Sequence, residues 1–135
     1  KEMALLPGNV VATYCGESRH ESVPDVLGRA DVFALPTLGE NYGHVIHEAL
    51  SAGCPVVISD RTSWRNLTEV GVGFDVSLEN IEYFVRSIQT FIDMDASEYG
   101  GYAERCRNFA IRRSSMDADI DASRQMFTYT TGARQ

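Results

Sequence analysis

Hydrophobic residues along this chain alternate between short apolar runs and longer stretches with helical periodicity. Two almost wholly apolar runs span residues 31–36 and 55–59, a run rich in β-branched residues spans 9–16, and a weaker one spans 73–77. Short continuous apolar runs bounded by turn residues are typical of strands covered on both faces of a parallel sheet. We therefore predict four strands at these positions in an α/β domain.

The clearest helical pattern lies between the predicted strands at 31–36 and 55–59, from about Gly43 to Ala52. At 100° per residue, its apolar residues fall in one arc and its polar residues in the opposite arc. The apolar arc holds Val45, Ile46, Ala49, Leu50 and Ala52, and the polar arc holds His44, His47, Glu48 and Ser51. Gly53 is expected to end the helix in the left-handed conformation. Strand, helix and strand then form a crossover unit of a parallel sheet.

Further helices are expected on either side of this unit. Ser22 can cap a short helix, a helical turn is expected over 62–67, an amphipathic pattern predicts a helix over 81–94, and two closing helices are expected over 97–111 and 116–129. The residues expected to face the core are Val23, Val26 and Leu27 in the first helix, and Ile81, Phe84, Val85, Ile88 and Ile92 in the helix over 81–94.

Composition narrows the class of protein. A chain of 135 residues with 44% hydrophobic and 23% charged residues suits one soluble domain, or part of one. The net charge of −7 argues against a protein that follows a nucleic-acid backbone. No apolar stretch approaches the roughly 20 residues that span a bilayer. Cys15 and Cys54 lie in apolar runs, which favours buried free thiols and a reducing cytoplasm.

Two carboxylates, Glu40 and Glu48, carry the candidate chemistry. Glu40 lies in a loop bounded by glycines, and Glu48 lies about one turn into the helix that follows. Both can therefore face a pocket at the helix N-terminus, where backbone N–H groups attract phosphate. One acid would suit the hydroxyls of a sugar and the other a ribose, which is the chemistry of a nucleotide-sugar site. Periodicity alone leaves a second interpretation of Glu48, a solvated residue on the polar arc.

A longer motif surrounds these two acids. It reads Asp31-Val-Phe-Ala-Leu-Pro36-Thr37, Glu40-Asn-Tyr-Gly43, Glu48-Ala-Leu-Ser-Ala-Gly53-Cys-Pro55-Val56 and Ser59-Asp60. It resembles the C-terminal, donor-binding domain of retaining glycosyltransferases of the GT-B fold, family 4, also called group 1. The resemblance implies a Rossmann-like three-layer α/β domain with a parallel sheet and closing C-terminal helices. Residues 1–135 would form a single domain, part of the C-terminal nucleotide-sugar-binding domain, with the N-terminal acceptor domain absent.

The resemblance also implies roles for individual residues. Glu40 would be the catalytic-site carboxylate that binds hydroxyls of the donor sugar, and Glu48 would accept hydrogen bonds from the ribose. The remaining donor-binding residues would be Thr37, Asn41, Tyr42, Gly43 and His44. Gly43 has no side chain, so its backbone can approach a ligand closely. A structural role in the turn is an equal alternative for Thr37, and a surface histidine is an equal alternative for His44.

An enzyme of this family would transfer a glycosyl group from a nucleotide-diphosphate sugar to an acceptor held by the N-terminal domain, so the isolated chain is expected to be inactive. Its expected partners are the donor and the acceptor, with no nucleic acid. The expected location is the cytoplasm or the inner face of the membrane, which leaves peripheral membrane association open, and the expected process is cell-envelope polysaccharide synthesis. No cofactor is expected. No metal is expected either, because His44, His47 and Glu48 do not have the His-Glu-x-x-His spacing of a zinc helix.

Two alternatives and two unassigned features remain. The chain could be a non-catalytic nucleotide-sugar-binding or structural module of the same fold, although intact Glu40 and Glu48 count against it. A signalling receiver would need an acidic cluster at an early strand end, which Gly16 and Glu17 do not supply. Trp64 is expected to pack under its loop or to face a second domain. The arginines of the closing helix are expected to form a solvated face: Arg105, Arg107, Arg112 and Arg113.

Overall fold

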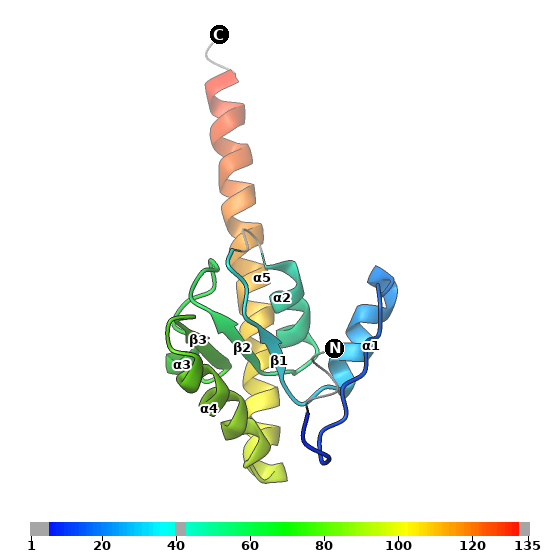
Figure 1. The fold of residues 1–135 in the computed structure, drawn as a ribbon. Coiled ribbons are helices and arrows are strands. Elements are labelled where there is room, and N and C mark those ends of the chain that lie inside the picture. The colour runs from blue at the N-terminus through cyan, green and yellow to red at the C-terminus, as the bar shows by residue number, and fades with distance from the viewer. Residues whose placement is uncertain (1–5, 40–42, 133–135) are drawn as a thin grey trace.

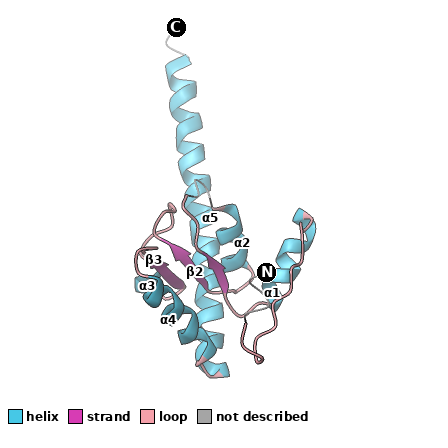
Figure 2. Ribbon diagram, viewed as in Figure 1, coloured by secondary structure: helices cyan, strands magenta, loops and turns pink. Residues whose placement is uncertain are grey.

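A three-stranded parallel sheet forms the centre of the computed structural model, which describes residues 6–39 and 43–132, with side chains up to Phe127 (Figures 1 and 2). The strands lie in the order β1-β2-β3. They are β1 (Phe33–Leu35), β2 (Val56–Ser59) and β3 (Gly73–Val76). Phe33 pairs with Val56, and Val56 pairs with Gly73. The predicted α/β class with a parallel sheet is confirmed.

Helices cover both faces of this sheet and complete three layers (Figure 1). They are the 3-10 helix η2 (His20–Ser22) and the α-helices α1 (Val23–Arg29), α2 (His44–Ser51), α3 (Leu67–Val70), α4 (Ile81–Ile92) and α5 (Ala96–Gly132). Val56 and Ile58 of β2 pack into one cluster with α2 and α5, whereas Val57 packs into a second cluster with α4. The alternation of side chains along β2 therefore separates two hydrophobic cores.

The two strands of the crossover unit differ in burial. All four residues of β2 are buried, because strands flank it on both sides and helices cover both its faces. In β1, Phe33 and Leu35 are half-buried and Ala34 is exposed. Within the described residues β1 pairs with β2 alone, so it is an edge strand. The expectation of strands covered on both faces holds for β2 and is wrong for β1.

The strand predicted over residues 9–16 is absent from the structure. Val11 and Tyr14 are 89% and 81% exposed, and this segment makes no pairing with β1. A strand is stabilised by a hydrogen-bonded neighbour and by burial of alternate side chains, and here the apolar sequence has neither. Cys15 is consequently exposed, contrary to prediction, whereas Cys54 is buried as predicted.

Helix α4 buries only part of the predicted face. Phe84 is buried and Ile88 is partly buried against the second cluster, as predicted, but the buried face is rotated away from the other three residues. Phe84, Ser87 and Phe91 are buried, while Ile81, Val85 and Ile92 are 61%, 58% and 65% exposed. The Phe91 ring meets two other aromatic rings edge-on, with centroid distances of 5.7 Å to Phe74 and 5.1 Å to Tyr102. Such pairs favour this geometry, and we attribute the rotation of α4 to them. In α1, Leu27 is buried but Val26 is 53% exposed, so the prediction for Val26 is wrong.

The C-terminal part of the chain forms one helix rather than the two predicted. Helix α5 runs without a break through residues 112–115, where the sequence holds neither glycine nor proline. Its first half packs on the sheet and its second half extends beyond the body of the protein (Figure 1). The predicted turn at 62–67 is also displaced, because α3 starts only at Leu67, where the Asp75 carboxylate accepts a hydrogen bond from the Leu67 N–H at 3.0 Å. None of the helices in the described ranges is long and apolar enough to span a membrane.

Candidate functional site

The candidate site lies at the carboxyl edge of the sheet, where β1 and β2 end and α2 begins. Thr37 follows β1, and its side chain closes a local turn: the hydroxyl donates to the Gly39 carbonyl at 2.9 Å and accepts from the Gly39 N–H at 3.2 Å. The hydroxyl of Ser59, the last residue of β2, donates a hydrogen bond to the Thr37 carbonyl. These contacts support the structural alternative for Thr37 and tie the start of the loop to β2.

Three of the predicted site residues, Glu40, Asn41 and Tyr42, lie outside the described residues. Their assignment to the donor sugar and to the turn therefore stays a prediction. The structure does describe both ends of the segment that carries them, Gly39 and Gly43.

Gly43 is the N-cap of α2, and it is buried in the left-handed conformation with φ 61° and ψ 41°. Its carbonyl accepts hydrogen bonds from the N–H groups of Ile46 at 2.9 Å and His47 at 3.1 Å. A Cβ atom at this position would lie 2.5 Å from Nε1 of Trp64. Glycine is therefore required both for its conformation and for its small volume. The sequence predicted close approach of a ligand here, and the neighbour in the structure is the indole of Trp64.

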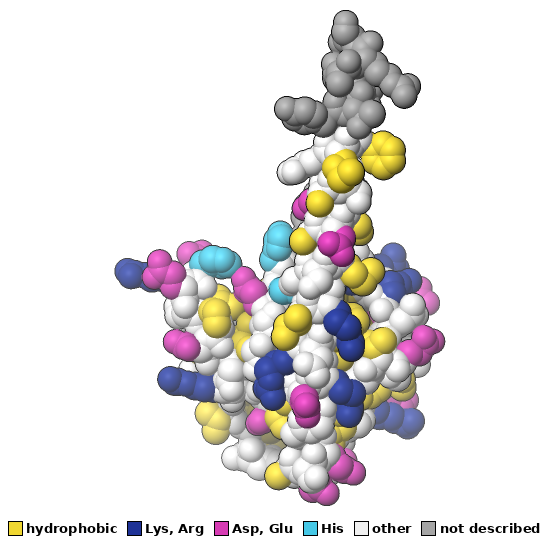
Figure 3. All heavy atoms as spheres, turned by 180° about the vertical axis from the view of Figure 1, so that it is seen from behind, with side chains coloured by type: hydrophobic (Ala, Val, Ile, Leu, Met, Phe, Trp, Pro, Cys, Tyr) yellow, Lys and Arg dark blue, Asp and Glu magenta, His cyan; other side chains and the backbone are white. Residues whose placement is uncertain are grey.

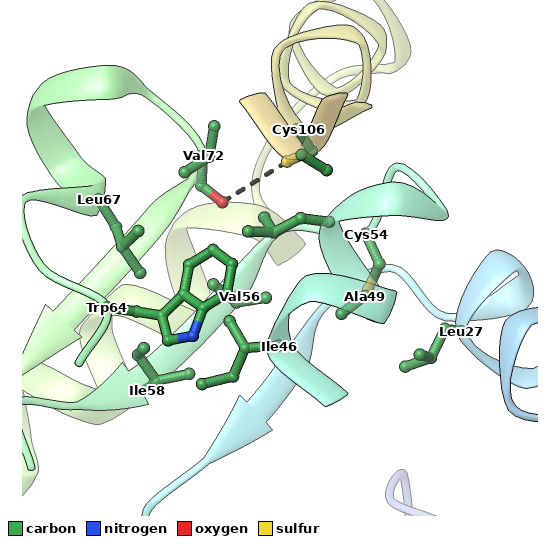
Figure 4. Packing of buried hydrophobic residues seen from close by; sticks show 12 residues of the cluster. Leu27, Ile46, Ala49, Cys54, Val56, Ile58, Trp64, Leu67, Val72 and Cys106 are labelled. Atoms are coloured by element: carbon green, nitrogen blue, oxygen red, sulfur yellow. Dashed lines mark hydrogen bonds between the residues drawn. The ribbon is translucent and has the colours of Figure 1, made fainter. Parts of the chain in front are cut away.

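Trp64 packs beneath the start of α2 and is 2% exposed, which confirms packing under the loop (Figure 4). Thr62, itself buried, holds its backbone: the Trp64 N–H donates to the Thr62 hydroxyl at 3.1 Å. On the α5 side, the Arg113 guanidinium carbon lies 3.7 Å from the centroid of the indole. Arg113 is thus a cation–π partner of a buried ring. The prediction of a solvated arginine face is wrong at this position.

Arg105, predicted to lie on the same solvated face, also contacts the protein. Its Nε donates to the Gly71 carbonyl at 2.9 Å, and its guanidinium lies 4.4 Å from the centroid of the Tyr102 ring. Gly71 is the C-cap of α3, so a cation meets the negative end of that helix. The arginines at 105 and 113 therefore join α5 to its neighbours.

His47 and Glu48 lie side by side on α2 but make contacts in different directions. His47 Nε2 lies 3.2 Å from the Ala110 carbonyl and 2.9 Å from the Ser114 hydroxyl, both on α5. The Glu48 side chain is 25% exposed, and its Oε1 lies 3.6 Å from Nδ1 of His20 in η2. Within the described residues, no group of three or more His, Cys, Asp or Glu side chains could hold a metal ion.

A groove runs along the α5 side of this edge. His44 and His47 of α2, Trp64 after β2, and Arg113, Asp117 and Arg124 of α5 are among its lining residues. In Figure 3, His side chains lie beside α5 where that helix leaves the body, and acidic and hydrophobic side chains continue along its far half. The groove therefore brings the exposed start of α2 next to groups of both charges.

The buried thiols near α2 serve packing. Burial raises the pKa of the Cys54 thiol to about 11, with a further increase from the Asp31 carboxylate. Burial is the main cause that raises the pKa of the Cys106 thiol to about 12, and the neighbouring Cys54 is the second. The Cys106 thiol donates to the Val72 carbonyl at 3.5 Å (Figure 4). Since the thiolate is the nucleophile, neither cysteine is activated for covalent catalysis at neutral pH.

An open parallel sheet with a loop and a helix N-terminus at its carboxyl edge is the arrangement with which α/β proteins bind ligands. The family model of the group 1 glycosyl transferases matches residues 3–113, and the chain belongs to this family. The match confirms the predicted resemblance. It ends at Arg113, so the second half of α5 lies beyond the part that the family model matches.

Two curated relatives are similar to the chain. It is 27% identical over 103 residues to the lipopolysaccharide core biosynthesis mannosyltransferase LpsB of Rhizobium meliloti (strain 1021), covering 71% of this chain and 29% of the relative. It is 26% identical over 106 residues to the UDP-Gal:alpha-D-GlcNAc-diphosphoundecaprenol alpha-1,3-galactosyltransferase of Escherichia coli, covering 78% and 27%. The chain thus spans less than a third of either relative. No solved structure matches it significantly.

Sequence reasoning missed three contacts at this edge: the Ser59 bond to the Thr37 carbonyl, the Arg113 stack on Trp64, and the His20–Glu48 pair. Each joins residues at least 20 positions apart, so no local pattern specifies it. A polar residue closing an apolar strand was the available signal for Ser59, and a single tryptophan directly after the motif was the signal for Trp64.

Proposed function

We propose that this chain is the donor-binding part of a longer retaining glycosyltransferase, which moves a glycosyl group from a nucleotide-diphosphate sugar to an acceptor. One observation carries the proposal: the described part of the family's Glu-x-x-Gly and Glu-Ala motif, from Gly43 to Ala49, lies at the carboxyl edge of the sheet. Gly43 starts α2 there, and Glu48 lies about one turn into that helix with its carboxylate partly accessible. Membership of the group 1 family supports this assignment.

The residue roles follow the chemistry of retention. The reaction needs stabilisation of an oxocarbenium-like transition state and of the departing nucleotide diphosphate, mainly by positioning and electrostatics. In our proposal Glu40 binds hydroxyls of the donor sugar, and Asn41, Tyr42 and His44 contribute to the turn around it. The first N–H groups of α2 are suited to phosphate oxygens. Thr37 acts through the turn that it closes.

Glu48 is the proposed ribose ligand. Two carboxylate oxygens can accept hydrogen bonds from adjacent hydroxyls, as acidic residues do for ribose in dinucleotide-binding folds. The partial exposure of Glu48 leaves its carboxylate open to a ligand, and its ionic partner His20 is 88% exposed. A ribose can therefore replace the contact with His20 without disturbing the core.

The longer protein would supply what this chain does not. We propose that residues 1–135 belong to one C-terminal domain, and that a separate N-terminal domain binds the acceptor. The isolated chain should then lack transferase activity, and the reaction should need no cofactor besides the donor. The names of the relatives, which refer to lipopolysaccharide core and diphosphoundecaprenol, support a role in cell-envelope glycan synthesis. We place this role at the cytoplasmic face of the membrane.

Calorimetric titration of the longer protein with UDP, GDP and their sugar conjugates tests the proposal. Glu48→Gln should weaken binding of the preferred nucleoside diphosphate by about tenfold, roughly 1.4 kcal/mol. The matched control is Glu69→Gln, because Glu69 is exposed on α3, outside the proposed site. Equal affinities for the unaltered protein and Glu48→Gln would refute the ribose assignment. Donor binding without any turnover would favour the non-catalytic module instead.

A further inference from the structure

We propose that Trp64 is a positioning residue for the donor loop, which we define as residues 37–43, and that Arg113 on α5 holds Trp64 in place. The inference rests on the proposed role of Glu40 in binding the donor sugar. Glu40 lies three residues from each end of the donor loop. Residues that fix the two ends therefore restrict where its carboxylate can lie.

The indole fixes the C-terminal end of the donor loop. A Cβ atom on Gly43 would lie 2.5 Å from Nε1 and 2.9 Å from Cδ1 of Trp64, so the Gly43 backbone rests directly on the ring. Gly43 holds φ 61° and starts the hydrogen-bonded turn of α2 through its carbonyl. A smaller side chain at position 64 would leave a space beneath Gly43, and the entry to α2 could then shift.

The ring itself is held from three elements. The Thr62 hydroxyl fixes its backbone through a hydrogen bond of 3.1 Å. The guanidinium of Arg113 stacks on the indole at 3.7 Å, and the Phe109 ring lies 6.3 Å away, centroid to centroid. The His47 ring on α2, with its centroid 6.1 Å away, completes the surroundings. Trp64 is buried and Arg113 is half-buried, so this cation–π pair should contribute about 1 kcal/mol.

The N-terminal end of the donor loop is fixed by the same part of the chain. Ser59 is fully buried at the end of β2, and its hydroxyl donates to the Thr37 carbonyl. Trp64 lies five residues further along. The end of β2 and the loop that follows it thus hold both ends of the donor loop, and among the described residues Trp64 connects the donor loop to Arg113 of α5. A displacement of about 1 Å in a reacting group can cost about 100-fold in rate, so this support bears on turnover.

A double-mutant cycle in the longer protein tests the inference, with release of nucleoside diphosphate from UDP-galactose, UDP-glucose and GDP-mannose as the assay. We expect Trp64→Leu to lower kcat about 30-fold and Glu40→Gln to lower it about 100-fold. The kcat of the double variant should lie within about threefold of the kcat of Glu40→Gln. Trp64→Phe, which keeps an aromatic ring, should recover most of the loss. Glu48 is untouched in each variant, so the affinity for free nucleoside diphosphate should fall by less than kcat does, and in Trp64→Leu only through the first N–H groups of α2.

Amide hydrogen exchange supplies a readout that needs no substrate. The N–H groups of Ile46 and His47 bond to the Gly43 carbonyl, so both should exchange at least about tenfold faster in Trp64→Leu, and Trp64→Phe should recover most of this protection. The control is Leu67→Ala, at a buried residue of the same core cluster that belongs to α3. Equal exchange of these two N–H groups in Trp64→Leu and Leu67→Ala would overturn the inference, and so would additive effects in the cycle. If Glu40→Gln alone leaves turnover unchanged, or no donor is turned over, the proposed function fails instead.

Discussion

The two sides of α2 differ in how extensively the rest of the protein contacts them. On the side toward α5, Ile46 and Leu50 are fully buried, and His47 bonds to backbone and side-chain oxygens of α5. On the side toward η2, the Glu48 carboxylate is partly exposed, and its ionic partner is the highly exposed His20. We call these the closed side and the open side of α2.

In our proposal, this difference separates the side of α2 that supports the helix from the side that recognises the ligand. The closed side is packed and hydrogen-bonded within the protein. These contacts fix the position and rotation of the helix and of Gly43 at its start. The open side presents carboxylate oxygens whose present partner a ligand can replace. A binding helix needs both sides, because an acceptor group is useful only when the helix that carries it is held still. Substitutions on the two sides should therefore change different measurements.

The largest effect is expected from a deletion on the closed side. Leu50→Ala should lower the free energy of unfolding by about 2–5 kcal/mol, because it leaves a cavity at a fully buried position. The matched deletion on the open side, Glu48→Ala, should change it by no more than about 0.5 kcal/mol. Urea unfolding measures both. Similar losses for the two variants would contradict the division of α2 into two sides.

A somewhat smaller effect is expected at the start of the helix. Gly43→Ala should cost at least about 2 kcal/mol, because it forces a left-handed alanine and brings Cβ against Trp64. Gly39→Ala is the control, since no described residue beyond its chain neighbours lies within 4 Å of a Cβ atom there. Thermal unfolding of the two variants compares them. A Gly43→Ala protein as stable as Gly39→Ala would show that Trp64 does not support this backbone.

The third effect is confined to alkaline pH. The thiols of Cys54 and Cys106 have an ordinary pKa of 9.0 in the unfolded chain and about 11 and about 12 in the fold. Between these values the unfolded state releases protons that the folded state retains, so stability should fall as the pH rises above 9. Replacing both buried cysteines with alanine should reduce the loss of stability per pH unit above pH 9, and replacing the exposed Cys15 should not. An unchanged loss of stability per pH unit in the double variant would rule out the buried thiols as its cause.

The smallest effect on stability is expected on the open side. His20→Ala should alter the free energy of unfolding by less than about 0.5 kcal/mol, because the His20 side chain is 88% exposed and lies 3.6 Å from the Glu48 carboxylate. Nucleoside diphosphate affinity should stay within about twofold or improve, since a ligand that takes the Glu48 oxygens no longer competes with His20. Calorimetry measures the affinity. A severalfold loss of binding would mean that His20 contacts the nucleotide itself.

The parts of the fold predicted correctly are those that local pattern determines. Helix α2 has a complete apolar arc and a left-handed Gly53 at its end, so its range, its buried face and the strands on both sides follow from the sequence. The rotation of α4 that exposes Ile81, Val85 and Ile92 does not follow, because the edge contacts of Phe91 with Phe74 and Tyr102 join separate elements. The segment 9–16 reads as a strand because β propensity cannot reveal whether a pairing partner is present.

The candidate site divides in the same way. The positions of Gly43 and Glu48 at the start of α2 follow from the motif, since spacing along one helix places them, while their roles stay predictions. The Ser59 and Arg113 contacts depend on the approach of β2 to the donor loop and of α5 to the Trp64 loop, which only the tertiary fold specifies. Arginines on a polar helix face are usually solvated, and Arg113 departs from that pattern because a buried indole lies within its reach. Support for a site is thus harder to predict than the groups that carry its chemistry.

The central claim, that the open side of α2 binds the ribose of a nucleotide sugar, has a direct test. Calorimetry on the longer protein would compare its preferred nucleoside diphosphate with the 2′-deoxy form, before and after Glu48→Gln. We predict that the unaltered protein favours the ribose form by about tenfold or more, and that Glu48→Gln reduces this preference to about twofold or less by weakening the ribose form. An undiminished preference in Glu48→Gln, or none in the unaltered protein, would contradict the claim.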